Sequence, residues 1–363
     1  MKDIRNYSLL AHNTFGIDAC CRRFLEYDTV EEAQQIVASL TGADRPLLIL
    51  GGGSNLLLTD DYQGTVLHSA IRGIEVLDHE ALAEVGEAHG MKDETVAEND
   101  GQLLNPDQVF LRCGSGEVFD DVVAYAVEHG YHGAENLSII PGEVGASAVQ
   151  NIGAYGVEAK DIIYKVEAVE IATGKVVTFS NADCQYSYRQ SKFKHEWRDK
   201  YLVTHVTYRL TKTFVPDLDY GNIRASLAVK GIEKPTAQQL RDVIIEIRNA
   251  KLPDPKVQGN AGSFFMNPIV EKAKYEELAA LYPGMPHYTI DAEHEKIPAG
   301  WMIDQCGWKG KSLGNAGVHD KQALVLVNRG GAKGKEIVHL CETIQRDVKK
   351  KFGIEIHPEV NIK

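Results

Sequence analysis

A run of glycines is the first feature of the sequence that could bind a ligand. It consists of Gly51, Gly52, Gly53, Ser54 and Asn55 and directly follows an apolar run. Consecutive glycines leave no Cβ in the way, so their N–H groups can converge on a diphosphate, and Ser54 and Asn55 can add side-chain donors. The run matches neither the P-loop nor the G-x-G-x-x-G fingerprint, so an ordinary tight turn without a ligand stays open.

A second segment rich in small residues, 141–156, has little side-chain bulk, which indicates a loop that something flat or large approaches closely. Val149, Ile152 and the intervening Gln150-Asn151 argue against the alternative, a flexible linker, because linkers are not built from such residues.

Three further side chains could act on a reacting group. Arg189, among tyrosines, could fork onto a carboxylate, although an arginine in this setting is usually a surface group. Ser263 follows two small residues and precedes two aromatics without a G-x-S-x-G elbow, so a proton donor fits better than a hydrolase nucleophile. The alternative interpretation of Ser263 is an ordinary hydroxyl group in a turn. Glu359 matters only if the tail folds back, which the apolar residues Ile354, Ile356 and Val360 favour.

The elements that must position these residues follow from apolar spacing and turn signals. Helical spacing predicts helices over 30–40, 118–127, 240–247 and 337–352, and two of them begin with capping boxes, at Thr29 and Thr236. Apolar or alternating runs predict strands over 47–50, 108–113, 165–171, 175–179, 201–210 and 323–327. The acidic segment 80–102 has no periodicity and is interpreted as an exposed insertion.

Composition limits the classes of function. A chain of 363 residues predicts two or three domains, and its net charge of −12 argues against nucleic-acid binding. No stretch is long and apolar enough for a membrane span and the first residues do not resemble a signal peptide, so we expect a cytoplasmic protein that contacts no membrane. The six scattered cysteines predict reduced thiols, without a disulfide framework or a bound metal.

In order and spacing, these motifs resemble the UDP-N-acetylenolpyruvoylglucosamine reductase (UDP-N-acetylmuramate dehydrogenase) family. The resemblance runs from Asn13-Thr14-Phe15 to Glu359, and its most specific strings begin at Lys251, Gly259 and His357. It implies an α+β protein with a two-subdomain FAD-binding fold of the p-cresol methylhydroxylase/vanillyl-alcohol oxidase type and a C-terminal α+β substrate-binding domain. It also implies that FAD is held by two groups of residues: Gly51, Gly52, Gly53, Ser54 and Asn55, and Gly145, Ser147, Asn151 and Gly153. We accordingly predict FAD-binding subdomains over 1–65 and 66–215, a substrate-binding domain over 216–340, and a C-terminal helix and tail over 341–363 that returns to the active site.

The resemblance also implies an activity: reduction of UDP-N-acetylglucosamine enolpyruvate to UDP-N-acetylmuramate by NADPH through FAD, in peptidoglycan precursor synthesis. By position, Arg189 is the cation beside the substrate carboxylate, Glu359 its hydrogen-bonding partner and Ser263 the proton donor. The chain resembles the longer type, marked by a tyrosine-bearing loop, and we expect a monomer. Residues matching the family's substrate contacts are Tyr220, Lys251, Asn267, Tyr288 and Gln322.

Two alternative functions stay open. An FAD-linked oxidase of an alcohol or hydroxy acid would share the glycine-rich segments but gives no reason for the strings between Lys251 and Asn267. A non-catalytic flavoprotein that binds nucleotide sugars would keep the fold, but the presence of Arg189, Ser263 and Glu359 argues against lost catalysis.

Overall fold

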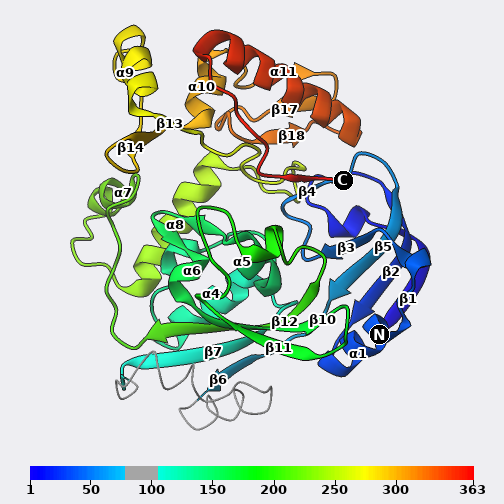
Figure 1. The fold of residues 1–363 in the computed structure, drawn as a ribbon. Coiled ribbons are helices and arrows are strands. Elements are labelled where there is room, and N and C mark those ends of the chain that lie inside the picture. Colours follow the sequence, from blue (N-terminus) through cyan, green and yellow to red (C-terminus); the bar gives the residue numbers. More distant parts are fainter. Residues whose placement is uncertain (78–104) are drawn as a thin grey trace. The chain divides into compact units, whose positions relative to one another are not determined.

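The computed structural model of the protein describes residues 1–77 and 105–363, and the predicted acidic insertion 80–102 lies outside the described residues (Figure 1). The chain forms two compact units that interleave along the sequence. The first comprises Met1–Tyr7, Cys21–Gly52 and Gln63–Arg248. The second comprises Ser8–Cys20, Gly53–Tyr62 and Asn249–Lys363.

The first unit contains a four-stranded sheet in the order β1-β2-β5-β3. Its strands are β1 (Lys2–Ser8), β2 (Cys20–Tyr27), β5 (Tyr62–Ser69) and β3 (Leu47–Leu50). Helix α1 (Val30–Ser39) connects β2 to β3 and begins at Thr29, whose side chain accepts the Glu32 N–H at 3.2 Å. The predicted helix start and the strand over 47–50 are confirmed.

The first unit also contains a five-stranded antiparallel sheet, in the order β11-β10-β12-β7-β6. Its strands are β11 (Val176–Ser180), β10 (Ile163–Glu170), β12 (Tyr201–Thr211), β7 (Gln108–Gly114) and β6 (Ile74–Leu77). Helices α4 (Phe119–Glu128), α5 (Val144–Gln150) and α6 (Ala159–Ile162) cover one face of it (Figure 1). The apolar residues of these strands and helices form one continuous core.

The last part of the first unit is helical. Helix α8 (Ala237–Lys251) begins with the predicted capping box, in which Thr236 and Gln239 each accept the other's backbone N–H. Its apolar face packs against α7 (Ile223–Val229), and Tyr155 covers the same cluster. The helix ends two residues before Pro253, as expected because proline cannot continue a helix.

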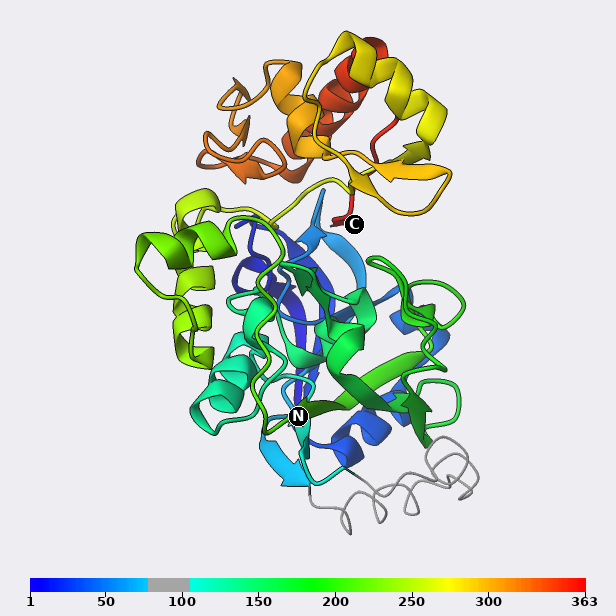
Figure 2. The same cartoon turned by 90° about the vertical axis from the view of Figure 1, so that its left-hand side faces the viewer.

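The second unit combines small sheets and three helices. Strands β13 (Ile269–Glu271), β15 (His294–Lys296) and β14 (Tyr288–Thr289) form one sheet, and β16 (Ser312–Leu313), β17 (Ala316–Val318) and β18 (Leu326–Asn328) form another. Helix α11 (Gly334–Phe352) lies beside β17 and β18, and the remaining helices are α9 (Lys272–Leu281) and α10 (Ala299–Gln305) (Figures 1 and 2). The predicted last helix is confirmed.

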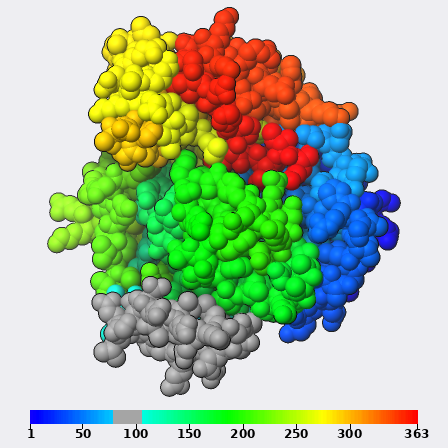
Figure 3. Space-filling view, in the orientation of Figure 1, coloured from blue at the N-terminus to red at the C-terminus, as the bar shows by residue number. Residues whose placement is uncertain are grey.

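The end of the chain folds back into the second unit. Strand β19 (Asn361–Ile362) pairs in parallel with β4 (Leu56–Leu57), and the red tail lies against the light-blue segment in Figure 3. The Thr59 N–H donates to the Lys363 carbonyl oxygen at 2.7 Å. The expectation that apolar tail residues fold back is therefore correct, and Ile354, Ile356 and Val360 are buried.

Two local predictions differ from the structure. The segment 141–156, expected to be a loop, contains helix α5 over Val144–Gln150, because Val144 and Ala148 bury completely against the sheet and a bare glycine at position 145 lets Ser115 approach. The predicted strand 323–327 is a strand only over Leu326–Asn328. Ala323 and Val325 are buried outside any strand, so the apolar run of this segment reflects burial rather than strand geometry.

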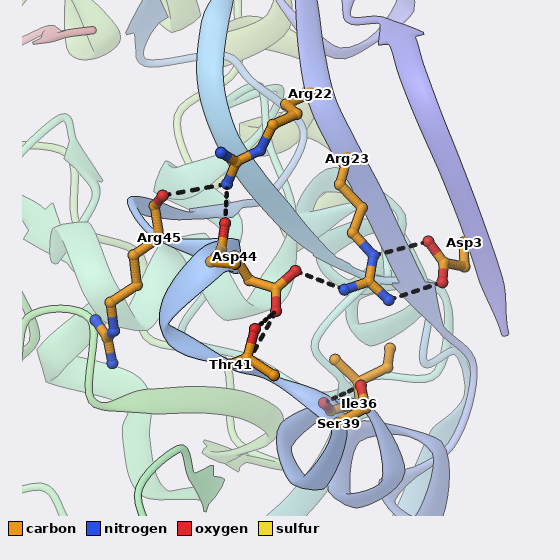
Figure 4. A network of polar contacts seen from close by, with 9 residues as sticks. Asp3, Arg22, Arg23, Ile36, Ser39, Thr41, Asp44 and Arg45 are labelled. Carbon is orange, nitrogen blue, oxygen red and sulfur yellow. Dashed lines mark hydrogen bonds and ion pairs between the residues drawn. The ribbon is translucent and has the colours of Figure 1, made fainter.

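An ion-pair network ties the first strand to the segment that follows α1 (Figure 4). Arg23 on β2 donates to both Asp3 carboxylate oxygens, at 2.9 and 2.7 Å, and to Asp44 at 2.6 Å. The hydrogen bond from Arg23 lowers the pKa of Asp3. At Asp44, burial alone would raise the pKa of the carboxyl. Hydrogen bonds from the Thr41 N–H and the Arg23 guanidinium outweigh burial and lower this pKa.

The described residues contain no helix long and apolar enough to cross a membrane. Within the same ranges, no three His, Cys, Asp or Glu side chains gather closely enough to hold a metal ion. All six cysteines are free thiols, and burial raises the pKa of Cys184 and of Cys341 to about 12.

Candidate active site

The guanidinium of Arg189 is presented by a tight turn in the first unit. Ser187 and Gln190 exchange two backbone hydrogen bonds, of 3.1 and 3.0 Å, across the turn. Arg189 itself has a left-handed backbone, with φ of 58°. A non-glycine residue in this conformation is uncommon and often marks a functional position. The turn therefore fixes the direction in which the arginine side chain leaves the backbone.

The charged end of Arg189 is directed by backbone carbonyl groups. Its Nη2 donates to the Gly153 carbonyl oxygen at 2.5 Å and its Nη1 to the Asn151 carbonyl oxygen at 3.3 Å. The carboxylate of Glu158 lies farther away, with 3.9 Å between Nη1 and Oε1. The two carbonyl groups orient the guanidinium, which suits a group that must bind an anion.

Gly153 makes this arrangement possible because it has no side chain. A Cβ added there would lie 2.7 Å from Arg189 Nη1 and 2.8 Å from the Val157 carbonyl oxygen. Both distances are shorter than real Cβ atoms tolerate. The strand pair β8 (Gly153–Ala154) and β9 (Val157–Glu158) thus packs against the arginine through a bare backbone.

Asn151 joins the segments that carry Arg189 and Gly153. It ends helix α5 with φ of 46°, a conformation that asparagine adopts more readily than most residues. Its buried amide donates to the Ser187 carbonyl oxygen at 2.8 Å and accepts the Lys160 N–H at 3.0 Å. Ser191 adds a bond of 2.7 Å to the Val149 carbonyl oxygen. The end of α5 is therefore fastened to the Arg189 turn.

The glycine turn after β3 packs against the start of α5. A Cβ on Gly51 would lie 3.2 Å from Ala146 Cβ, and one on Gly52 would lie 3.4 Å from Gly142 Cα. Among the hydrogen bonds of the described residues, none uses the N–H of Gly52 or of Gly53. Such open N–H groups on a bare backbone fit an anionic group such as the diphosphate of FAD.

A buried histidine braces the same turn. His68 Nδ1 lies 3.0 Å from Glu26 Oε2, and its Nε2 lies 3.4 Å from Oε1 of Glu143, the residue that begins α5. Burial alone would lower the pKa of His68. The hydrogen bonds with Glu143 and Glu26, together with the negative charges of these two residues, outweigh burial and raise the pKa. Sequence reasoning missed this group, because His68 and Glu143 are far apart along the chain.

The other residues predicted to contact the cofactor are placed as follows. Gly145 donates its N–H to the Ser115 carbonyl oxygen at 2.8 Å. The Ser147 hydroxyl lies 2.7 Å from the Tyr208 hydroxyl and is buried in the core. Asn55, in the second unit, donates to the Glu359 carbonyl oxygen at 3.4 Å. These contacts place the residues without testing whether they touch FAD, so those assignments stay predictions.

In the second unit, two of the predicted catalytic residues lie on neighbouring segments. The Glu359 N–H donates to the Phe264 carbonyl oxygen at 2.8 Å, and the Met266 N–H donates to the His357 carbonyl oxygen at 2.9 Å. This antiparallel pairing brings the tail residue Glu359 next to the segment that carries Ser263. Ser263 is exposed and Glu359 is partly buried. The tail and the Ser263 segment, almost a hundred residues apart, therefore form one local structure.

The predicted substrate residues are on several elements. Tyr220, in the first unit, meets Tyr155 edge-on with 6.4 Å between ring centroids. In the second unit, Asn267 accepts the Ala299 N–H at 2.9 Å and so holds the start of α10. Gln322 accepts the Leu324 N–H at 3.3 Å. Lys251 is exposed at the end of α8, and the exposed Tyr288 ring lies 5.6 Å from Lys296 Nζ.

Sequence reasoning also missed Arg248, one turn before the end of α8. It follows Ile244 by four residues and so continues the apolar stripe of the helix, where a charged residue is unexpected. This interruption of the stripe is the signal that could have found it. Burial lowers the pKa of Arg248, and the charges of Tyr155, Asp120 and Arg189 act on it.

Comparisons with known proteins point to the same family, and the matches with whole proteins extend over 98% of the chain. Residues 254–363 match the model of the UDP-N-acetylenolpyruvoylglucosamine reductase C-terminal domain, and residues 97–180 match that of an FAD binding domain. The chain is 53% identical over 358 residues to a UDP-N-acetylenolpyruvoylglucosamine reductase of Bacteroides fragilis, covering 98% of this chain and 99% of that one. It is 41% identical to the same-named protein of Flavobacterium johnsoniae, covering 98% of each chain.

A solved structure shows the same fold. The crystal structure of UDP-N-acetylenolpyruvylglucosamine reductase from Thermus caldophilus aligns with a TM-score of 0.63 at 20% identity, covering 99% of this chain and 98% of that one. The expected α+β fold, with an FAD-binding part and a separate C-terminal domain, is confirmed.

Proposed function

The chain belongs to the UDP-N-acetylenolpyruvoylglucosamine reductase family, and from this premise we propose that it uses NADPH and FAD to reduce UDP-N-acetylglucosamine enolpyruvate to UDP-N-acetylmuramate. The observation that supports this most is the 53% identity to a reductase of that name over 98% of the chain. The product would serve peptidoglycan precursor synthesis in the cytoplasm.

The glycine turn after β3 and the region around α5 would hold FAD. Gly51 and Gly52 offer a bare backbone, and the Gly52 and Gly53 N–H groups are not used by the described residues. Asn151 and Gly153 belong to the same predicted set. When bound, FAD would supply transfer of a hydride from NADPH to the enolpyruvyl double bond.

The proposed roles of the side chains follow from where charge develops. Hydride addition to the terminal enolpyruvyl carbon leaves negative charge on the carbon beside the carboxylate, and this charge spreads into the carboxylate. Arg189 would stabilise it, because its guanidinium is already oriented by carbonyl groups. Glu359 in its protonated form would donate a hydrogen bond to the carboxylate. Ser263 would protonate the carbanion through its hydroxyl.

Substrate binding would rest mainly on residues of the predicted domain 216–340. Lys251 would offer a point charge to the diphosphate, and Tyr288 would lie on the loop that marks the longer type. The further proposed contacts are Tyr220, Asn267 and Gln322. A focused set of cationic and polar groups explains how an acidic protein can bind an anionic substrate.

The experiment that tests the function is an absorbance assay of NADPH oxidation by the purified, FAD-loaded protein. We expect a yellow protein that turns over NADPH repeatedly only when UDP-N-acetylglucosamine enolpyruvate is present. UDP-N-acetylglucosamine, which has the sugar nucleotide but no double bond, is the matched control. A colourless protein that takes up no FAD would contradict the proposal. Rapid oxygen consumption with an alcohol would favour an oxidase, and tight UDP-sugar binding without turnover a binding protein.

A further inference from the structure

His68, on β5 of the first unit, has a carboxylate at each of its two ring nitrogens. Its Nδ1 lies 3.0 Å from Glu26 Oε2, and its Nε2 lies 3.4 Å from Glu143 Oε1. The side chains of His68, Glu26 and Glu143 are 8%, 10% and 12% exposed. A neutral imidazole has only one N–H, and an ionised carboxylate can only accept hydrogen bonds. With both carboxylates ionised, the ring can donate to both only when it carries two protons and a positive charge.

The two carboxylates differ in the positive charge available to them. Glu26, on β2, is also paired with Lys2 on β1, whose Nζ lies 2.5 Å from Glu26 Oε1. Glu143, the residue before α5, has its only ion pair among the described residues with His68. Burial and the charge of Glu143 raise the pKa of Tyr27 on β2, so this hydroxyl stays neutral and adds no charge. Glu143 therefore depends on His68 for a neutralising partner.

Glu143 also lies against the glycine turn that would hold the diphosphate of FAD. A Cβ on Gly51 would lie 3.4 Å from Glu143 Oε2, and one on Gly52 would lie 3.7 Å from Glu143 Cγ. The turn thus combines a bare backbone suited to an anion with an acidic side chain beside it. An ionised carboxylate this close to the turn would repel a diphosphate unless a neighbouring cation balanced its charge.

We propose that His68 is a positioning residue for the cofactor: its charged ring holds and neutralises Glu143 beside the glycine turn, so that the turn can accept the diphosphate of FAD. This inference rests on the proposed function, which supplies FAD. Burial alone would lower the pKa of His68, but its hydrogen bonds with Glu143 and Glu26 and the charges of these residues raise it. The ring therefore keeps its charge below the raised value and loses it as pH rises through that value. The affinity for FAD should fall over the same range.

The proposal can be tested by titrating the full chain, freed of cofactor, with FAD and following flavin fluorescence. We expect the Kd of the unaltered protein to rise about 10-fold between about pH 6 and about pH 9, which spans the range above the ordinary histidine value. His68→Gln, which cannot become charged, should have a Kd about 10-fold above that of the unaltered protein at the lower pH, and this Kd should not vary with pH. A Kd of the unaltered protein that does not change with pH overturns the proposal, whether or not the variant folds.

A second substitution separates the charge of His68 from its packing. Adding Glu143→Gln to His68→Gln removes the carboxylate that the histidine balances, so the double variant should bind FAD about as tightly as the unaltered protein does at the lower pH, and equally at both pH values. A double variant that binds as weakly as His68→Gln would show that the histidine acts through packing alone, which contradicts the proposal.

His132→Gln is the matched control in the same unit. His132 Nδ1 lies 2.9 Å from Glu135 Oε1, so the variant also removes a histidine paired with a carboxylate, but neither residue belongs to the predicted cofactor set. Its Kd for FAD should follow the pH profile of the unaltered protein. A control that loses this profile would mean that His68 has no specific role. Failure of the unaltered protein to bind FAD at any pH would contradict the proposed function and this inference with it, whereas binding that ignores pH contradicts the inference alone.

Discussion

The guanidinium of Arg189 lies directly against the backbone of Gly153. Its Nη2 donates to the Gly153 carbonyl oxygen at 2.5 Å, and a Cβ at position 153 would lie 2.7 Å from Nη1. The absence of a side chain at one residue therefore determines where the charge of another can lie. If Arg189 stabilises charge in the reaction, this contact is part of the catalytic geometry although Gly153 has no functional group.

Gly153→Ala should displace Arg189 and slow the reaction with the enolpyruvyl substrate by about 100-fold, a typical loss when one charge-stabilising group is misplaced. The reaction of NADPH with bound FAD should continue at its usual rate. Stopped-flow absorbance measures the two half-reactions separately. Gly42→Ala is the control, because a Cβ at Gly42 would meet no atom within 4 Å. Equal slowing of both half-reactions would show that the contact has no specific role.

Asn151→Gly should loosen the turn that carries Arg189. Glycine keeps the left-handed backbone of this position, so the variant removes the side-chain bonds to Ser187, Lys160 and Glu158 without straining the turn. The Lys160 N–H loses its side-chain acceptor, while the Ser187 carbonyl oxygen keeps the Gln190 N–H, so we expect the free energy of unfolding to fall by about 1 to 2 kcal/mol. Denaturant unfolding measures this, and turnover should fall as well. A variant as stable and active as the original would refute the role of Asn151.

Ser263→Ala should separate the two half-reactions. NADPH should still bleach the flavin, but return of the colour on adding substrate should slow by about 100- to 10,000-fold, as for loss of a general acid. Ser312→Ala, which removes an exposed hydroxyl on β16 of the same unit, should change neither rate. If the Ser263 variant reoxidises at the original rate, another group protonates the carbanion.

Variants of Glu359 can show whether this side chain acts as a hydrogen-bond donor. Glu359→Ala should lose about 3 kcal/mol of transition-state stabilisation, in the range measured for single preorganised donors. Glu359→Gln has an amide that donates, so it should keep much more activity than the alanine variant. Comparison of kcat between the two decides the point. Equal losses in both variants would contradict donation by Glu359.

The Arg23 network should give a pH-dependent contribution to stability. Arg23→Met should lower the free energy of unfolding by about 1 to 3 kcal/mol at pH 7, because bonds to two carboxylates are lost. The pKa values of Asp3 and Asp44 are lowered in the folded protein. Their contribution is therefore present above the unfolded-state value of about 3.9 and is lost as pH falls through the folded values. The difference from the unaltered protein should shrink accordingly below about pH 4.

Arg22→Met is the control for this pH dependence. The Arg22 guanidinium donates to the carbonyl oxygens of Ala43 and Arg45, which do not titrate (Figure 4). The effect of this variant on unfolding should be the same at pH 7 and pH 3. If the Arg23 and Arg22 variants respond to pH alike, the carboxylates are not the source of the stability.

Local elements could be predicted because their signals are local. The capping residues Thr29 and Thr236 and the apolar spacing of 337–352 report contacts within one or two helical turns, so α1, α8 and α11 were predictable. Helix α5 was not, because its small residues give no amphipathic pattern and its stability depends on burial against distant strands.

The sequence by itself determined the family and the type of fold, and it predicted roles for Arg189, Ser263 and Glu359, because these inferences depend on which residues occur and in what order. Only the tertiary structure decided what surrounds them. It brought the tail carrying Glu359 beside the Ser263 segment, placed Gly153 under Arg189, and gave Asp120 to Arg241 while leaving Arg248 without an acidic partner among the described residues. The reason is physical: whether a charge is neutralised, oriented or left open depends on groups that only folding brings near it.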